Sequence, residues 1–264
     1  MQTVERAERI LERVRRDGRV YTVQLAAEYG VSEETIRRDI RALAREGKLK
    51  RVHGGATELR LPSSENAYVV RRLLDAEEKR RIGEYAAGLV DDGDIIAMDD
   101  SCCAEQLALA LSGQQNLIAV TNFLPAAAAL SERIQQGRIS GRVVLLGGEM
   151  NCENLAACGA ITEEEAARYR FKRAFIGASA LAENGAMVWN LEEGRVSRRM
   201  AERASSVVLL CESAKFTRTS LYQYIDYSEV DMLITDDTHE IPRETLTRLQ
   251  GDGVEVIVLG EKKA

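Results

Sequence analysis

The chain has very little histidine and no cysteine spacing that is typical of a metal site. Its two histidines, His53 and His239, lie far apart in the sequence, so nothing indicates a metal centre or a serine–histidine–aspartate triad. The five cysteines include no C-x-x-C pair and no spacing typical of zinc ligands. We therefore expect neither a metal ion nor a cofactor.

An export signal is also missing, because the N-terminus is charged from Glu5 onward. An uncharged run over residues 106–130 is long enough to raise the question of a membrane span. Glycine, polar residues and Pro125 interrupt this run, so it predicts two helices and a strand instead. An odd number of cysteines without an export signal indicates free thiols. These observations predict a cytoplasmic protein.

Charge is divided unevenly along the chain, whose net charge is −6. Residues 1–60 carry 14 Lys and Arg against 10 Asp and Glu, so this part is net +4 and the remainder is net −10. The acidic total argues against a protein that coats nucleic acid indiscriminately. A locally basic segment instead suits a DNA reader with one contact patch, whose binding is sensitive to salt.

Residues 30–41 (GVSEETIRRDIR) are typical of the second helix of a helix-turn-helix. Gly30 can adopt the positive φ of a tight turn, and Ser32 can cap a helix that begins at Glu33. Apolar residues recur at i, i+4 and i+7 and are expected to face the core of the domain: Ile36, Ile40 and Leu43. Side chains able to reach phosphates and base edges are Ser32, Thr35, Arg37, Arg38 and Arg41. An ordinary amphipathic helix with a basic face is the alternative.

The flanking segments favour the helix-turn-helix. The apolar positions Ile10, Leu11 and Val14 predict a first helix that ends near residue 18, and residues 20–22 predict a short strand. Thr22 is expected to cap a second helix over residues 23–28, and Gly47 to stop the recognition helix. Residues 48–56 (KLKRVHGGA) alternate and turn like a β-hairpin. Such a wing places four residues along the phosphate backbone: Lys50, Arg51, His53 and Gly54.

Short apolar strands alternate with helices from about residue 76 onward. The predicted strands are residues 94–98, 117–121, 143–146, 174–177, 207–211, 232–235 and 254–258. The predicted helices are residues 77–90, 104–111, 125–134, 162–169 and 196–204. This alternation predicts a mostly parallel sheet covered on both faces, with a ligand at the carboxyl ends of the strands.

Residues suited to holding a small anion follow five of these strands. The loop after the first strand also opens a helix, whose backbone N–H groups can cradle a phosphate. The candidates, in chain order, are Asp99, Ser101, Cys102, Cys103, Thr121, Asn122, Gly147, Gly148, Gly177 and Lys215. Because five strand ends contribute, we expect a binding crevice at this edge of the sheet.

These segments together resemble the DeoR family of bacterial transcription regulators over nearly the whole chain. In the first part the shared features are Arg6, Ile10, Val14, residues 32–40 and residues 51–56. In the second part they are residues 120–122, residues 146–148 with Gly159, residues 174–178, Glu193 with Val196, and Lys215 with Phe216. The family's effector domain is similar to sugar-phosphate isomerases such as ribose 5-phosphate isomerase.

The resemblance implies an α/β protein with an N-terminal winged helix-turn-helix followed by a Rossmann-like, mostly parallel-sheet effector domain. We expect the winged helix-turn-helix over residues 1–58, a linker and connecting segment over 59–75, and the effector domain over 76–264. The implied function is a repressor of a carbohydrate-metabolism operon that a phosphorylated sugar or related metabolite releases from operator DNA. The resemblance also implies that Glu193 belongs to the effector-binding site. An operator with two half-sites is read by two DNA-binding domains, so we further predict a homo-oligomer, a dimer or tetramer.

The sequence departs from the family pattern at four places. Residues 101–103 are Ser-Cys-Cys where the family usually carries Gly-Thr-Thr. Lys172 and Glu212 each stand where an aspartate is common, and Ser197 stands where a lysine is common. The loss of a glycine and two hydroxyls changes the donors that a phosphate would meet, although backbone N–H groups remain.

Two other functions compete with the effector-released repressor. Cys102 and Cys103 open a helix, whose N-terminus lowers thiol pKa values, so a thiol-responsive regulator is one alternative; small buried core cysteines are the other reading of the pair. A sugar-phosphate isomerase would draw its acid–base groups from Asp99, Asp100, Glu193 and Lys215. The chain lacks the Asp-Gly-Ala-Asp and Lys-Gly-Gly-Gly segments that ribose phosphate isomerases carry, so we expect no enzyme.

Overall fold

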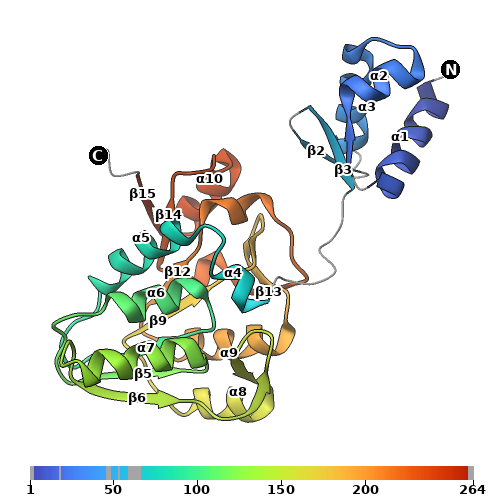
Figure 1. Cartoon of the computed structure of the whole chain (residues 1–264). Helices are drawn as coiled ribbons and strands as arrows, with labels where there is room; N and C mark the ends of the chain where they lie inside the picture. Colours follow the sequence, from blue (N-terminus) through green and yellow to red (C-terminus); the bar gives the residue numbers. More distant parts are fainter. Residues whose placement is uncertain (1–2, 18, 46–48, 53, 59–66, 261–264) are drawn as a thin grey trace. The chain divides into compact units, whose positions relative to one another are not determined.

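The computed structural model describes residues 3–17, 19–45, 49–52, 54–58 and 67–260 (Figure 1). The chain forms two compact units, Met1–Ser63 and Ser64–Ala264, which we call the head and the body. None of the helices in the described ranges has the length and apolar character needed to cross a membrane.

The head contains three helices and a small antiparallel sheet. Its elements are α1 (Thr3–Asp17), β1 (Arg19–Tyr21), α2 (Thr22–Tyr29), α3 (Glu33–Arg45), β2 (Leu49–Val52) and β3 (Gly55–Glu58), and the strand order is β1-β3-β2. The core contains the apolar residues that the helical spacing predicted, including Ile10, Val14, Ile36, Ile40 and Leu43. The helix-turn-helix and its wing are therefore confirmed.

The turn before α3 has the predicted chemistry. Gly30 has a φ of 65°, and the backbone N–H of Thr35 donates to Oγ of Ser32 at 3.2 Å. The prediction for Thr22 was wrong: this residue is the first residue of α2, Tyr21 is the N-cap, and no side chain caps the helix. The N–H of Thr22 instead donates to the carbonyl of Gly54 in the wing at 2.8 Å. Gly47 lies outside the described residues.

A buried ion pair joins the first and third helices of the head. Nε of Arg6 donates to Oδ2 of Asp39 at 2.5 Å, and Nη2 donates to Oδ1 at 3.3 Å. Both residues are only 5% exposed, so each charge depends on the other for its compensation. The Asp of the Ile-Arg-Arg-Asp segment therefore holds α1 against α3.

The body is built on a seven-stranded parallel sheet with the order β15-β14-β12-β9-β4-β5-β6. Its strands are β4 (Ile95–Met98), β5 (Leu117–Thr121), β6 (Gly141–Leu145), β9 (Arg173–Gly177), β12 (Val207–Leu210), β14 (Met232–Asp236) and β15 (Glu255–Leu259). The chain adds β5 and β6 on one side of β4 and then crosses to β9 on the other side. The order therefore reverses between β4 and β9, which is where parallel sheets bind ligands.

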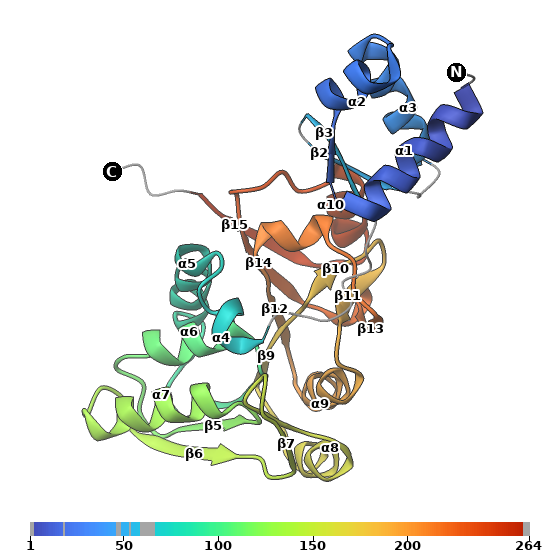
Figure 2. The same cartoon turned by 45° about the vertical axis from the view of Figure 1, so that its right-hand side comes forward.

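Helices cover both faces of this sheet. On one face lie α5 (Ala76–Ala87), α6 (Cys102–Ala110) and α7 (Leu124–Gln135), and on the other lie α8 (Ala160–Ala167) and α9 (Leu191–Glu202) (Figure 2). The apolar core of the body is accordingly split into two clusters, one containing Ile82 and Leu107, the other Val196 and Met200. Leu249 of α10 (Arg243–Gly251) belongs to the second cluster. The predicted Rossmann-like layer order is confirmed.

Several smaller elements were not predicted. The hairpin β7–β8 (Glu149–Asn151 and Ala156–Cys158) follows β6, and a second sheet has the order β10-β11-β13 (Ala180–Leu181, Gly185–Val188 and Tyr222–Asp226). A short helix, α4 (Tyr68–Arg71), precedes α5, and two 3-10 turns occur, η1 (Ser213–Thr217) and η2 (Tyr227–Glu229). The helix predicted from residue 196 begins at Leu191, because the side chain of Asn190 caps it by accepting from the N–H groups of Glu192 and Glu193.

Asp39→Ala is expected to lower the free energy of unfolding of the head by about 3–5 kcal/mol, because it leaves the Arg6 charge buried without its partner. The change can be measured in the full chain as faster hydrogen exchange of α1 and α3 amides. Glu28→Ala is the matched control. Its carboxylate pairs with Arg13 at 3.7 Å where both side chains are partly exposed, and its loss should cost less than about 1 kcal/mol. Equal effects of the two substitutions would contradict the role given to the buried pair.

Candidate functional site

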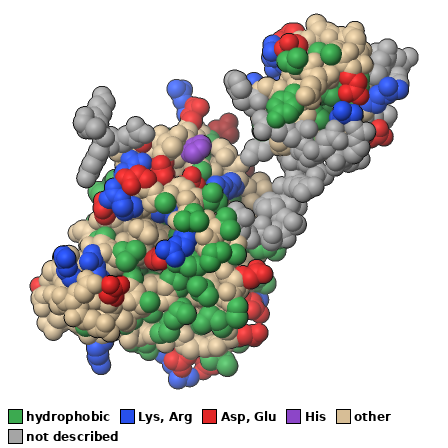
Figure 3. Space-filling model, viewed as in Figure 1, with side chains coloured by type: hydrophobic (Ala, Val, Ile, Leu, Met, Phe, Trp, Pro, Cys, Tyr) green, Lys and Arg blue, Asp and Glu red, His purple; other side chains and the backbone are tan. Residues whose placement is uncertain are grey.

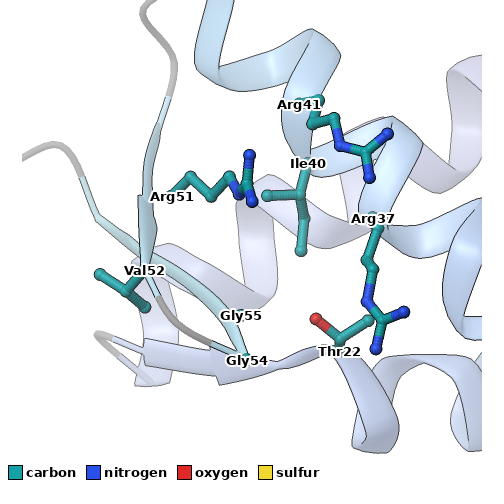
Figure 4. A pocket seen from close by; sticks show the side chains of 8 residues that line it. All are labelled: Thr22, Arg37, Ile40, Arg41, Arg51, Val52, Gly54 and Gly55. Atoms are coloured by element: carbon teal, nitrogen blue, oxygen red, sulfur yellow. The ribbon is translucent and has the colours of Figure 1, made fainter.

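The recognition helix α3 and the wing enclose a pocket of about 630 Å³ in the head. Figure 4 shows that Arg37 and Arg41 reach it from α3, while Arg51 extends from β2 toward α3. The rest of the lining consists of Thr22, Ile40, Val52, Gly54 and Gly55. Three guanidinium groups around one cavity create a cationic surface of the kind that binds phosphates.

Two glutamates at the start of α3 hold these arginines in the free protein. Nη2 of Arg37 lies 2.7 Å from Oε2 of Glu33, and Nη2 of Arg41 lies 3.3 Å from Oε1 of Glu34. All four side chains are more than 40% exposed. Ion pairs in water contribute little, so DNA phosphates can displace the carboxylates at small cost. Arg38 is exposed on the same helix.

The structure brings most of the predicted DNA-contact residues of the head to one region. Ser32 and Thr35 lie at the N-terminus of α3, where their hydroxyl oxygens are 2.9 Å apart. Gly54 and Arg51 lie in the wing beside α3. Lys50 belongs to β2, but its side chain and the whole of His53 lie outside the described residues.

In the body, Asp99 occupies the point where the strand order reverses. Oδ2 of Asp99 accepts from the N–H of Gly177 at 2.8 Å and from the hydroxyl of Ser197 at 3.1 Å, and Oδ1 accepts from the N–H of Ser101 at 3.1 Å. Burial raises the pKa of Asp99, although these donors act in the opposite direction. The carboxylate thereby ties β4 to β9, α6 and α9.

The start of α6 packs tightly against the end of β9. The hydroxyl of Ser101 accepts from the N–H of Ala104 at 3.1 Å and caps α6. A side chain at Gly177 would place its Cβ 2.3 Å from Cβ of Ser101, so this close approach requires glycine. Cys102 and Cys103, the first two residues of α6, are buried.

A buried carboxylate and two lysines lie at the end of β12. Oε1 of Glu212 is 2.5 Å from Nζ of Lys79 on α5, and Oε2 is 3.7 Å from Nζ of Lys215 in η1. Burial acts to raise the pKa of Glu212, but Lys215 and Lys79 together hold it below its ordinary value. Lys79 also donates to the carbonyl of Leu74, and Sγ of Cys103 lies 3.9 Å from Oε2 of Glu212.

The strand ends of β5 and β6 are connected to neighbouring elements. The hydroxyl of Thr121 accepts from the N–H of Phe123 at 3.1 Å, and Nδ2 of Asn122 donates to the carbonyl of Ala157 at 2.9 Å. Oδ1 of Asn122 is buried and accepts no hydrogen bond from the described residues. The carbonyl of Gly147, next to Gly148, accepts from the hydroxyl of Thr162 on α8 at 2.8 Å.

Glu193 holds the β7–β8 hairpin against α9. Its Oε1 accepts from Nδ2 of Asn151 at 2.7 Å and from Nδ2 of Asn154 at 3.0 Å, and its Oε2 accepts from Nδ2 of Asn154 at 2.9 Å. Sequence reasoning missed both asparagines. It also missed Lys79, although its position three residues before the buried Ile82 places it on the inward stripe of α5.

The predicted crevice residues therefore fall into three groups. Asp99, Ser101 and Gly177 are in direct contact, and Cys103 and Lys215 both lie beside Glu212, which was not among the predicted site residues. The residues of the third group meet through the hairpin and α8: Thr121, Asn122, Gly147, Gly148 and Glu193. Within the described ranges, no cluster of three or more His, Cys, Asp or Glu could hold a metal ion.

The surroundings of the paired cysteines disfavour reactive thiolates. Burial raises the pKa of Cys102, although Arg71, Lys79 and Lys215 act to lower it. Burial, with the Glu212 charge, raises the pKa of Cys103 well above its ordinary value. Both thiols are therefore protonated at neutral pH, which argues against the thiol-responsive alternative.

Two known protein-domain families match the chain, one in the head and one in the body. Residues 6–60 match the DeoR-like helix-turn-helix domain, and residues 74–237 match the DeoR C terminal sensor domain. The chain is 31% identical over 255 residues to the HTH-type transcriptional repressor GlcR of Bacillus subtilis (strain 168), covering 96% of this chain and 95% of the relative. It is 30% identical over 239 residues to the glycerol-3-phosphate regulon repressor of Escherichia coli (strain K12), covering 89% and 92%.

Among solved structures, ribose 5-phosphate isomerase A from Methanocaldococcus jannaschii is similar with a TM-score of 0.36 and 16% identity, over 53% of this chain and 54% of that one. A helix-turn-helix head joined to a sensor body defines a DNA-binding transcription regulator that responds to an effector. The chain belongs to the DeoR family and is a non-enzymatic transcriptional repressor. The resemblance found in the sequence is confirmed.

Cys102 and Cys103 are expected to react with iodoacetamide much more slowly than the exposed Cys152, because both are buried and have raised pKa values. Peptide mass spectrometry of the folded protein at neutral pH measures the rate at each site. Labelling in urea is the control and should make the five sites nearly equal. Rapid alkylation of Cys102 in the folded protein would restore the thiol-responsive alternative.

Proposed function

We propose that this chain represses an operon for the use of a sugar or a related phosphorylated compound, and that a phosphorylated sugar or related metabolite releases it from the operator. The name of one relative supports this class of target, since it is the glycerol-3-phosphate regulon repressor. One observation carries the effector part: Lys79, Lys215 and the first turn of α6, through Cys103, all lie against Glu212 at the end of β12.

The head supplies the DNA-contact part of the proposal. Arg37 and Arg38 on α3 are the side chains that we assign to base edges or adjacent phosphates in the major groove. Arg51 and Lys50 of the wing are assigned to the phosphate backbone, together with Arg41. The remaining members of the proposed contact set are Ser32, Thr35, His53 and Gly54.

Each of the two buried carboxylates in this part of the body has its own compensating partners. The carboxylate of Asp99 is occupied by three donors, and that of Glu212 is neutralised by Lys79 and Lys215. The effector phosphate is assigned to Lys215 and to the backbone at the start of α6, which carries the positive end of a helix dipole. The amide oxygen of Asn122 has no donor among the described residues, so it suits a sugar hydroxyl.

Release from DNA requires that the effector bind the DNA-free state more tightly than the DNA-bound state. A symmetric oligomer, a dimer or tetramer, is part of the proposal because two heads read two half-sites. The deciding experiment is fluorescence anisotropy on DNA from upstream of the gene, with and without a panel of phosphorylated sugars at millimolar concentration. Tight binding that no compound weakens would contradict the proposed effector class.

Arg37→Ala and Arg38→Ala are each expected to weaken operator binding by about 1–3 kcal/mol if the side chain reads a base. Anisotropy titrations at fixed salt measure the effect on operator and on random DNA. Arg243→Ala is the control, because Arg243 is an exposed arginine on α10 of the body. A loss of equal size on random DNA would assign the side chain to a phosphate, and no loss on either DNA would remove it from the contact set.

Lys215→Met is expected to leave operator binding intact and to abolish its release by the effector, because the substitution removes the ammonium assigned to the phosphate. The measurement is the effector concentration that halves the anisotropy signal. Lys172→Met, which changes an exposed lysine of the body, is the control and should respond like the wild type. A normal response in the Lys215 variant would exclude this residue from the effector site.

A further inference from the structure

Exposed apolar side chains surround the turn of the β7–β8 hairpin. Figure 3 shows hydrophobic side chains gathered on the face of the body where Figure 1 places α4 and α9. The exposed members on the elements around the hairpin are Val69, Val70, Leu73, Leu124, Met150 and Leu191, and we call them the hairpin face. Monomeric proteins seldom leave apolar side chains so concentrated on one surface.

Hydrogen bonds to the hairpin bring these elements together. The N–H of Tyr68 on α4 donates to the carbonyl of Glu153 at 3.0 Å, and the N–H of Leu124 on α7 donates to the carbonyl of Leu155 at 3.0 Å. The carboxylate of Glu193 on α9 accepts from Asn151 and Asn154. Three separate elements therefore meet at one hairpin, and each contributes an exposed apolar residue beside it.

The charges on the hairpin face are of both signs and lie on different elements. Arg72, at the end of α4, is exposed and lies 5.5 Å from the ring centroid of Tyr68. Glu149 and Glu153 are exposed on the hairpin. Among the described residues, none of these three charged groups takes part in an ion pair. A two-fold axis would place α4 of one copy against the hairpin of the other, so that Arg72 meets the glutamates twice.

We propose that the hairpin face is the dimer interface of this protein and that its occupant is a second copy of the chain. Apolar residues then form the centre and the Arg72–glutamate pairs form the rim, which is the usual anatomy of an interface. The proposal rests on the proposed function in one respect, because an operator reader needs two heads. Since α4 is the first element of the body, the axis passes near the point where each chain enters its body.

Sedimentation of the full chain without DNA or effector tests the interface apart from the proposed function. The wild type is expected to be a dimer at micromolar concentration, and Val69→Glu and Leu73→Glu are expected to give monomers. Val258→Glu is the matched control, since Val258 is 46% exposed on β15 and should leave the mass unchanged. Because Val69 and Leu73 are 60% and 75% exposed, circular dichroism should find each variant folded.

A charge exchange identifies the occupant as a second copy. Arg72→Glu and Glu153→Arg are each expected to weaken the dimer at least about tenfold through like-charge contacts. Both changes in one chain are expected to restore it, which a merely damaged fold would not allow. A wild-type monomer, or a dimer that none of these variants weakens, would overturn the proposal. A monomer whose head protects α4 from hydrogen exchange would assign the face to the chain's own head and overturn it equally.

Discussion

The carboxylate of Asp99 is the group on which the proposed effector site depends, because it connects four elements where the strand order reverses. It receives N–H groups from Gly177 on β9 and Ser101 before α6, and the hydroxyl of Ser197 on α9. A buried carboxylate needs such donors to remain in place without a cation. In the proposed function Asp99 is therefore a positioning residue, since it fixes the start of α6 beside the end of β9.

The second buried carboxylate of the proposed effector site is stabilised in a different way. Glu212 is neutralised by Lys79 and Lys215, which hold its pKa low, whereas burial dominates at Asp99 and raises its pKa. Ser197 stands where the family commonly has a lysine, and here its hydroxyl donates to Asp99. The two ammonium groups near these carboxylates, Lys79 and Lys215, thus lie on the side of β12 and α5. In the proposed function, the phosphate of the effector is therefore assigned to that side of α6.

Periodicity predicted the parallel sheet well, because its strands are short runs of mostly apolar residues. It did not predict β11, which pairs with β13 from about forty residues further along the chain and has little alternation of its own. The expectation that a ligand binds at the carboxyl ends of parallel strands pointed to Asp99, Asn122, Gly177 and Lys215. Lys79 was missed because the segment Ala-Glu-Glu-Lys-Arg-Arg reads as a solvated helix, and only packing against Glu212 makes one of its charges internal.

The recognition helix shows how burial separates structural from functional charge within one short motif. Asp39 points inward to Arg6, and the pair cannot be broken without exposing an uncompensated charge to the core. Arg37 and Arg41 point outward to Glu33 and Glu34, where water already weakens each contact. Phosphates can therefore replace the glutamates without disturbing the packing of α3 on α1. The helix therefore keeps its position through a buried ion pair, while the ion pairs of its surface arginines can be exchanged for contacts with phosphates.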